Sequence, residues 1–234
     1  KLSGWHIPND DEQGENRRGV IVLLHPIRGS RLTMLPRARW LHSVGYSIVM
    51  IDLQAHGEST GEQITLGHLE SRDARRAVEF ARASHPNEPI GVLGVSLGGA
   101  SSLLASPLDI DALILESVYP TIEQAIHNRV AAQLGPLASI PSKLLLWQLQ
   151  PRLGIDPSNL RPIDRIAAVG CPVFIMSGAD DEHTTVAETR AMFRLAKEPK
   201  DLWIVDGAQH VDLCGAATNA YKKRVLNFLA THMH

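Results

Sequence analysis

Ser96 occupies a position in which a serine can act as a nucleophile. Gly94 lies two positions before it, Gly98 lies two positions after it, and the apolar run 90–95 leads up to it. Where a strand turns directly into a helix, the two backbones nearly touch, and glycine is needed at these neighbouring positions. The alternative is an ordinary glycine- and serine-rich loop, but the apolar run before Ser96 and the helix-forming segment after it favour the tight turn. The pattern therefore predicts an accessible serine hydroxyl.

A serine hydroxyl is a weak nucleophile at neutral pH, so it needs a base that is itself oriented by an acid. His210 follows the apolar segment 201–205 and precedes a predicted helix, and we expect it to be the base. His183 is the rival, but it lies beside the expected acid on the same loop, from which it would rarely reach Ser96. The acid is Asp180 or Asp181.

The segments that must position these residues alternate between strands and helices. Because each expected strand is almost continuously apolar, the pattern predicts an α/β fold with a mainly parallel, doubly wound sheet and helices on both faces. Functional residues in such sheets gather at the carboxyl ends of the strands. The expected strands are 2–7 (an edge strand), 20–24, 46–51, 90–95, 112–116, 173–176 and 201–205, and the expected helices are 31–44 (capped by Ser30), 67–84, 97–106, 184–196 and 213–231. A surface turn is expected at 9–14.

This alternation is interrupted once, at about 118–170. The interruption is too apolar to be a linker, so we expect one domain over 1–234 with a small helical lid inserted at that point. Leu145 and Trp147 are expected to contribute to an apolar substrate pocket, although at least half of the apolar lid residues must simply pack the lid onto the domain.

Five motifs together resemble those of α/β-hydrolase-fold serine hydrolases. The chain is similar to the group with a short helical lid, which includes esterases, serine-aminopeptidase-like proteins and acyl thioesterases. The resemblance runs from about residue 20 to the end of the chain. The motifs are His25-Pro26-x-x-Gly29-Ser30, Asp52-x-x-x-His56-Gly57-x-Ser59, Gly94-x-Ser96-x-Gly98-Gly99, Gly178-x-x-Asp181 and Gly207-Ala208-x-His210.

The resemblance implies that Asp181 is the acid, because the family's carboxylate falls three residues after the glycine. An oxyanion needs two backbone N–H donors. Leu97 supplies one at a helix N-terminus, where the helix dipole favours negative charge, and the resemblance gives the other to Ile27. Pro26 stands where the family usually has glycine, but the donor is the next residue, so the oxyanion hole can persist. Arg28 could approach an anionic substrate group or could be a solvated loop residue.

Four further polar residues near the strand ends are expected to be structural. His25, Asp52 and His56 match family positions that organise loops, and Asp52 and His56 could exchange hydrogen bonds across a turn. Glu116 is expected to bind a backbone amide rather than to act as the catalytic acid, although a carboxylate there could take the acid's place.

Composition excludes several classes of function. A net charge of −2 gives no electrostatic reason to expect a nucleic acid partner. No apolar run approaches the roughly 18 residues of a membrane span, and we expect a cytoplasmic protein. Cys171 and Cys214 lack metal-site spacing, so no metal, cofactor or disulfide is required.

The sequence therefore predicts a serine hydrolase that acts on a small-molecule ester. We expect a carboxylesterase for short-to-medium, apolar acyl groups. An acyl thioesterase or a serine aminopeptidase could use the same residues, because all three reactions share a tetrahedral intermediate. A non-catalytic binding protein of the same fold is the alternative from another class.

Overall fold

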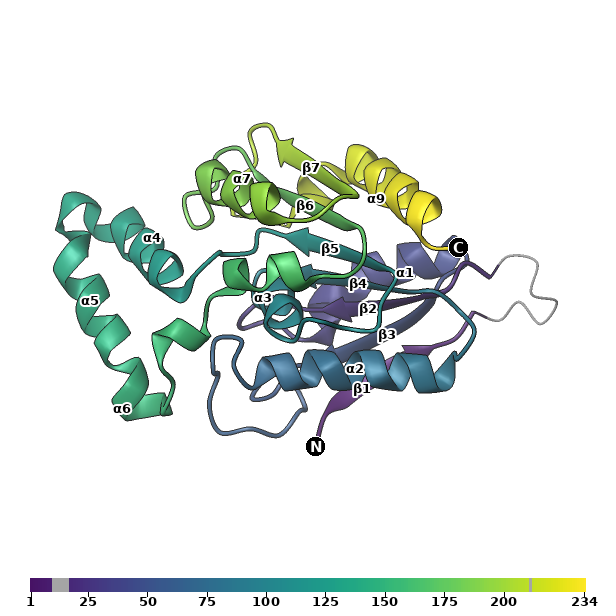
Figure 1. Cartoon of the computed structure of the whole chain (residues 1–234), viewed down its shortest axis with the longest axis horizontal. Helices are drawn as coiled ribbons and strands as arrows, with labels where there is room; N and C mark the ends of the chain where they lie inside the picture. Colours follow the sequence, from purple (N-terminus) through teal and green to yellow (C-terminus); the bar gives the residue numbers. More distant parts are fainter. Residues whose placement is uncertain (10–16, 211) are drawn as a thin grey trace.

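A computed structural model of the chain describes residues 1–9, 17–210 and 212–234. Apart from Asn9, the turn expected at 9–14 lies outside the described residues. In the described part of the chain, a seven-stranded sheet has the order β1-β3-β2-β4-β5-β6-β7 (Figure 1). The edge strand β1 is antiparallel to β3, and all other neighbouring strands are parallel. The strands are β1 (Ser3–Ile7), β2 (Val20–Leu24), β3 (Ser47–Asp52), β4 (Ile90–Val95), β5 (Ala112–Glu116), β6 (Val173–Gly178) and β7 (Lys200–Val205).

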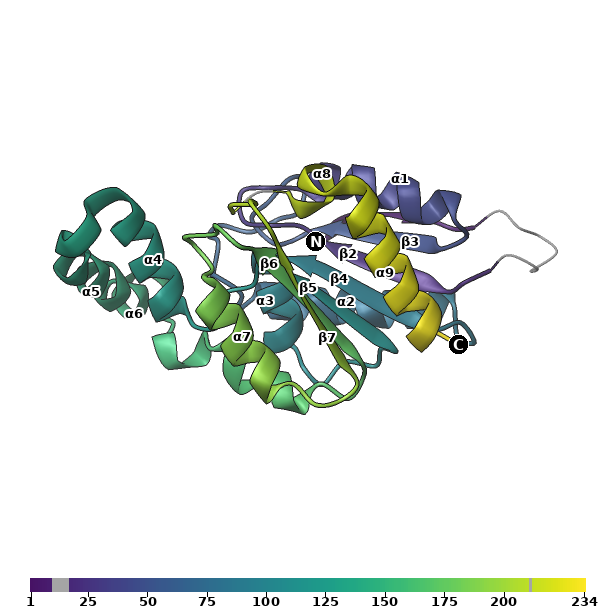
Figure 2. The same cartoon turned by 90° about the horizontal axis from the view of Figure 1, so that it is seen from above.

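Helices cover both faces of the sheet, as Figure 2 shows. The central strands are buried on both sides because alternate residues serve two separate cores. Ile21 and Leu23 pack on the face covered by α1 (Leu35–Ser43), α8 (Leu213–Ala216) and α9 (Thr218–His232). Val20, Val22 and Leu24 pack on the face covered by α2 (Glu70–Ser84), α3 (Leu97–Leu104) and α7 (Val186–Leu195). The predicted doubly wound α/β architecture is confirmed.

Several helix boundaries differ from the prediction for local reasons. The first helix begins with a 3-10 turn, Arg31–Met34, whose N-terminus is capped by the Ser30 side chain as predicted. Helix α7 begins after Thr185, because that side chain accepts the Glu188 N–H and so ends the preceding loop. The expected helix 213–231 divides at Ala217, whose backbone angles (φ −131°, ψ 43°) are not helical.

The segment between β5 and β6 is helical and projects beyond the strand ends. In both Figure 1 and Figure 2, α5 lies farther from the sheet than α4. The elements are α4 (Ile122–Leu134), η2 (Gly135–Ala138), α5 (Ser139–Trp147), α6 (Leu149–Leu153), η3 (Pro157–Asn159), η4 (Pro162–Asp164) and η5 (Ile166–Ala168). Within the described ranges, no helix combines the length and the hydropathy that crossing a membrane would require.

Candidate active site

Ser96 lies in a strained turn between β4 and α3. Its backbone angles are φ 48° and ψ −108°, which a residue other than glycine rarely adopts. A Cβ at Gly98 would lie 2.3 Å from the carbonyl oxygen of Leu24, and one at Gly94 would lie 2.5 Å from the amide nitrogen of Gly99. The Ser96 N–H donates to the carbonyl of Glu116 at 2.8 Å. Strand, turn and helix are therefore packed as the glycine spacing predicts.

The loops that follow β6 and β7 bring Asp181 and His210 together. Oδ2 of Asp181 lies 2.8 Å from Nδ1 of His210. Backbone hydrogen bonds join the two loops, from the Ala179 N–H to the Val205 carbonyl and from the Asp180 N–H to the Ala208 carbonyl, both at 2.9 Å. These bonds fix the carboxylate relative to the imidazole through the backbone.

Asp181 is held as a carboxylate. Its Oδ1 accepts the N–H groups of His183 and Thr184, both at 2.8 Å. Burial alone would raise the pKa of Asp181, but the hydrogen bond and charge of His210 and the two backbone donors together lower it below its ordinary value. Asp180 is exposed. The geometry favours Asp181 as the partner of His210.

Ser96 and His210 are not hydrogen-bonded in the described part of the chain. Ser96 lines a cavity, and the His210 side chain remains partly exposed. Hydrogen bonds between catalytic groups are often long in free enzymes and shorten when substrate binds. The rival base His183 lies beside His210, with 5.0 Å between the ring centroids.

The cavity at Ser96 has a volume of about 110 Å³. Its wall includes one face of α4, whose residues 122, 125, 126 and 129 follow the i, i+3, i+4, i+7 spacing of a helix. The lining residues are Ile27, Leu66, Ser96, Leu97, Tyr119, Ile122, Ala125, Ile126 and Arg129. The sequence interpretation missed the α4 residues, although their helical spacing after the N-cap Thr121 was a readable signal.

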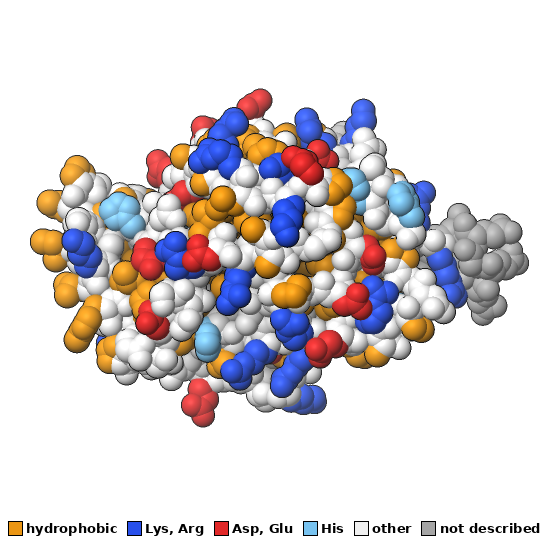
Figure 3. All heavy atoms as spheres, viewed as in Figure 1, with side chains coloured by type: hydrophobic (Ala, Val, Ile, Leu, Met, Phe, Trp, Pro, Cys, Tyr) orange, Lys and Arg blue, Asp and Glu red, His pale blue; other side chains and the backbone are white. Residues whose placement is uncertain are grey.

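Leu145 and Trp147, expected in the substrate pocket, lie elsewhere, and so does Arg28, for which the sequence left both a substrate contact and a solvated position open. Trp147 is 71% exposed and Leu145 is 46% exposed, both on α5. Arg28 is exposed on its loop. None of the three lines the cavity at Ser96. The structure therefore does not place Leu145 and Trp147 in this cavity, because α4 rather than α5 faces the strand ends, and Arg28 takes the solvated alternative. Figure 3 shows hydrophobic side chains exposed at the end of the molecule that these helices form.

Ile27 and Leu97, the two expected oxyanion donors, both line the cavity beside Ser96. Leu97 is the first residue of α3. Neither backbone N–H has an acceptor within the described residues. Both groups remain available to a ligand.

The expected structural residues form hydrogen bonds with the loops. His25 is fully buried; its Nε2 accepts the Leu53 N–H at 3.0 Å, and its Nδ1 lies 2.8 Å from the Pro26 carbonyl. Glu116 Oε1 accepts the Leu213 N–H at 3.1 Å, so the expected role of this carboxylate is confirmed.

The expected exchange between Asp52 and His56 is wrong. Asp52 instead pairs with the Arg31 guanidinium and accepts the N–H groups of Arg31 and Glu58. His56 Nδ1 lies 2.9 Å from the Gln54 carbonyl. The strong cation at Arg31 satisfies the carboxylate, and His56 contributes to the fold of its own turn.

The buried His25 predicts an acid-labile fold. Burial lowers its pKa to about 4, against an ordinary value near 6.5. The unfolded chain therefore binds a proton at this side chain that the folded chain does not, and the free energy of unfolding falls as the pH drops from about 6.5 to 4. The loss is up to about 3 kcal/mol. Urea unfolding over this pH range should show a weaker pH dependence in His25→Gln than in wild type.

The exposed His127 supplies the control for this measurement. His127→Gln should keep the wild-type pH dependence. Equal slopes for wild type and His25→Gln would contradict the prediction.

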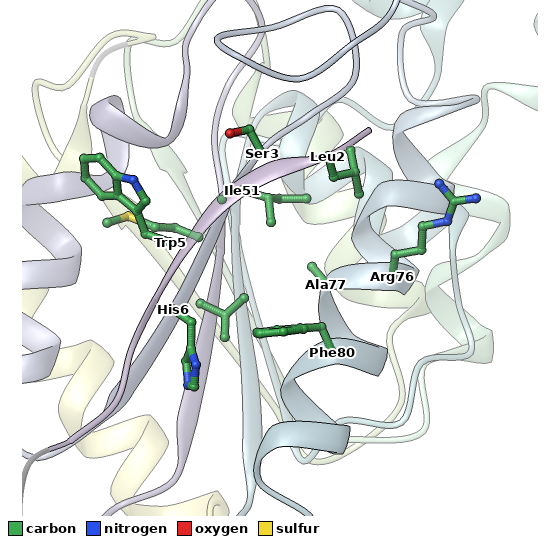
Figure 4. Close-up of a pocket in the computed structure, with 11 residues that line it drawn as sticks. Leu2, Ser3, Trp5, His6, Ile51, Arg76, Ala77 and Phe80 are labelled. Atoms are coloured by element: carbon green, nitrogen blue, oxygen red, sulfur yellow. The ribbon is translucent and has the colours of Figure 1, made fainter.

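A second cavity, of about 330 Å³, lies beside the antiparallel edge strand β1. Figure 4 shows Ala77 and Phe80 of α2 near β1 and Ile51. This cavity is larger than the one at Ser96, but it does not contain the strained serine or the His210–Asp181 pair, so we do not take it as the active site.

Across the described residues, no group of three or more histidine, cysteine or acidic side chains is arranged to hold a metal ion.

Comparison with known families agrees with this geometry. The family profile described as serine aminopeptidase, S33, matches residues 15–158. The chain belongs to this family. The matched region contains Ser96 and ends before Asp181 and His210.

Relatives and solved structures extend the comparison to the rest of the chain. The protein YfhR of Salmonella typhi is 26% identical over 246 residues, which cover 98% of this chain and 77% of YfhR. A monoacylglycerol lipase of Mycolicibacterium smegmatis is 25% identical over 227 residues, which cover 82% of this chain and 81% of that lipase. The structure of the Pyrococcus furiosus esterase Pf2001 superposes with a TM-score of 0.75 at 22% identity, covering 100% of this chain and 93% of that one. The fold is the α/β-hydrolase fold, and the chain is a hydrolase of this family.

Proposed function

We propose that this chain is a serine carboxylesterase in which Ser96 is the nucleophile, His210 the base and Asp181 the acid. The observation that carries the proposal is the position of Ser96, which lies in a strained turn and opens onto an apolar cavity beside two unoccupied backbone N–H groups. The His210–Asp181 pair on the neighbouring loops supports it. A strained non-glycine residue of this kind is typical of a functional site.

In this mechanism, Ser96 Oγ attacks the ester carbonyl carbon while His210 Nε2 takes the hydroxyl proton. The N–H groups of Leu97 and Ile27 stabilise the oxyanion. His210 then gives the proton to the departing alkoxide oxygen, which leaves an acyl group on Ser96. A water molecule, deprotonated by His210, attacks the acyl carbon, the bond between that carbon and Ser96 Oγ breaks, and His210 returns the proton to Ser96 as the carboxylic acid leaves.

The cavity supports a short acyl chain. A dry cavity of about 150 Å³ accommodates benzene, and the cavity at Ser96 measures about 110 Å³. Its wall is largely aliphatic and includes Ile122 and Ile126 of α4 and Leu66. We therefore propose short acyl esters as substrates, with longer chains accepted only if the cavity widens.

The cavity argues against an aminopeptidase, despite the description of the family. An aminopeptidase must accommodate a positively charged amino terminus close to the scissile bond. The charged side chain that lines this cavity is Arg129, a cation. Like charges in a poorly solvated site repel each other, so an ammonium group is disfavoured there.

A fluorophosphonate probe tests the proposal directly. We expect the probe to label wild-type protein and to leave folded Ser96→Ala unlabelled. A screen of matched esters, thioesters and aminoacyl amides should then show the highest kcat/KM on short esters. Absence of labelling in folded wild-type protein would favour a non-catalytic binding role, and turnover confined to aminoacyl amides would identify an aminopeptidase.

A further inference from the structure

Arg129 is a partly buried cation that has no carboxylate partner among the residues that the structure describes. It lies on the face of α4 that lines the cavity at Ser96. Its recorded hydrogen bond runs from Nη1 to the Ala125 carbonyl of its own helix, at 3.2 Å. Throughout residues 1–9, 17–210 and 212–234, no acidic side chain forms an ion pair with it.

The other described arginines that are not exposed behave differently. Each of them pairs with at least one carboxylate; they are Arg31, Arg37, Arg82 and Arg161. Removing a guanidinium from water is costly unless an anion or several hydrogen bonds compensate it. Arg129 therefore carries a desolvation cost that its described neighbours offset only in part, and a bound anion would offset the rest.

The groups around Arg129 leave it available to a ligand. The Tyr119 hydroxyl donates to the Leu66 carbonyl at 2.9 Å. The oxygens of Asp181 accept hydrogen bonds from His210 and from two backbone N–H groups, none of them from Arg129. Burial lowers the pKa of Arg129, and the nearby Asp181 carboxylate opposes this shift; a guanidinium nevertheless stays protonated at neutral pH.

The position of the cavity indicates which part of an ester would occupy it. The departing alcohol must lie next to His210, because that residue returns the proton to it. The cavity is lined by Ser96, Leu97 and Ile27 and not by His210. It is therefore placed to receive the acyl group.

We propose that the acyl chain of the substrate ends in a carboxylate that pairs with Arg129, so that the substrates are half-esters of short dicarboxylic acids. This inference rests on the proposed esterase function. The aliphatic wall of Ile122 and Ile126 would contact the methylene chain, and the planar guanidinium matches the two carboxylate oxygens.

Matched substrates test the pairing. The 4-nitrophenyl half-esters of succinate, glutarate and adipate are compared with the same compounds whose free carboxyl is methylated, after subtraction of uncatalysed hydrolysis. Wild type should prefer the charged half-ester of at least one chain length. Arg129→Gln should lower kcat/KM for that half-ester, mainly through KM, by about tenfold to a hundredfold more than for the methylated ester.

Two variants control for effects other than the pairing. Arg190→Gln removes an exposed arginine of α7 and should leave kcat/KM unchanged for both the charged and the methylated ester. Arg129→Lys keeps the charge but loses the planar fork, so it should retain part of the preference. Equal losses on charged and methylated esters in Arg129→Gln would show that Arg129 only supports the cavity and would overturn the proposal. A preference limited to esters with the carboxylate on the alcohol would overturn the acyl assignment.

Binding separates this inference from the esterase proposal. Monomethyl adipate is titrated calorimetrically into Ser96→Ala, which needs no turnover. Binding that is lost in the Ser96→Ala, Arg129→Gln double variant supports the anion site even if the hydrolysis proposal fails. Equal binding to both proteins, or none to either, overturns the site even if wild type hydrolyses neutral esters.

Discussion

Asp181→Asn is expected to reduce kcat on a short 4-nitrophenyl ester by about 10⁴-fold. The carboxylate accepts the His210 Nδ1–H at 2.8 Å and leaves Nε2 free to act as the base. An asparagine can present its NH₂ group to Nδ1, which favours the wrong tautomer of the imidazole and cannot stabilise the imidazolium. Losses of this size follow when the acid of such a group is replaced by its amide.

The fold should survive this substitution. An asparagine oxygen can still accept the N–H groups of His183 and Thr184, which the Oδ1 of Asp181 now holds. The measurement is kcat together with the thermal unfolding temperature, so that loss of activity is separated from loss of structure. KM should change little, because Asp181 does not line the cavity.

Asp180→Asn is the matched control. The Asp180 side chain is exposed. Its backbone N–H donates to the Ala208 carbonyl, and the substitution leaves this hydrogen bond in place. We expect its kcat to stay within about twofold of wild type. Full activity in Asp181→Asn, or a large loss in Asp180→Asn, would contradict the assignment of the acid.

Local features of this site could be predicted from the sequence because their causes are local. Gly94 and Gly98 are required by contacts within a few residues of Ser96, so their spacing carries the geometry of the turn. The apolar strands predict the sheet because burial on both faces leaves no polar alternation. The position of His210 follows from the place of its loop after β7.

Features that depend on distant packing could not be predicted. Leu145 and Trp147 are as apolar as Ile122 and Ile126, and composition does not reveal which lid helix faces the strand ends. The run 144–147 is more apolar than any run of four residues in α4, so apolar character alone favours the helix that does not line the cavity. Similarly, nothing local shows that Arg31 pairs with two carboxylates while Arg129 pairs with none in the described part of the chain.

A charge network, buried except for Asp212, supports the loop that carries His210. The Arg37 guanidinium lies 2.7 and 2.8 Å from the two oxygens of Glu116 and 2.5 Å from Asp212 Oδ1. Glu116 also accepts the Tyr221 hydroxyl at 3.0 Å and the Leu213 N–H. Asp212 and Leu213 follow His210 closely in the chain, so this network holds the C-terminal end of the loop that carries His210.

Arg37→Met is therefore expected to lower the free energy of unfolding by about 3–5 kcal/mol, because it leaves the fully buried Glu116 carboxylate without its cation. It should also slow the labelling of Ser96 by a fluorophosphonate, because the His210 loop loses its anchor at Asp212. Urea unfolding and the labelling rate are the two measurements. Arg82→Met, which breaks partly exposed pairs with Asp109 and Asp111, should cost no more than about 1 kcal/mol.

The double variant Arg37→Met, Glu116→Gln decides whether charge is the cause. It removes both charges and keeps a side-chain oxygen for the Leu213 N–H, so it should recover more than half of the stability lost in Arg37→Met alone. If instead the double variant were no more stable than the single one, packing of the Arg37 side chain rather than the uncompensated carboxylate would explain the loss. The double variant still lacks the Arg37–Asp212 pair, so its labelling should stay slow even where stability recovers, and a recovered labelling rate would contradict the role of that pair in positioning His210.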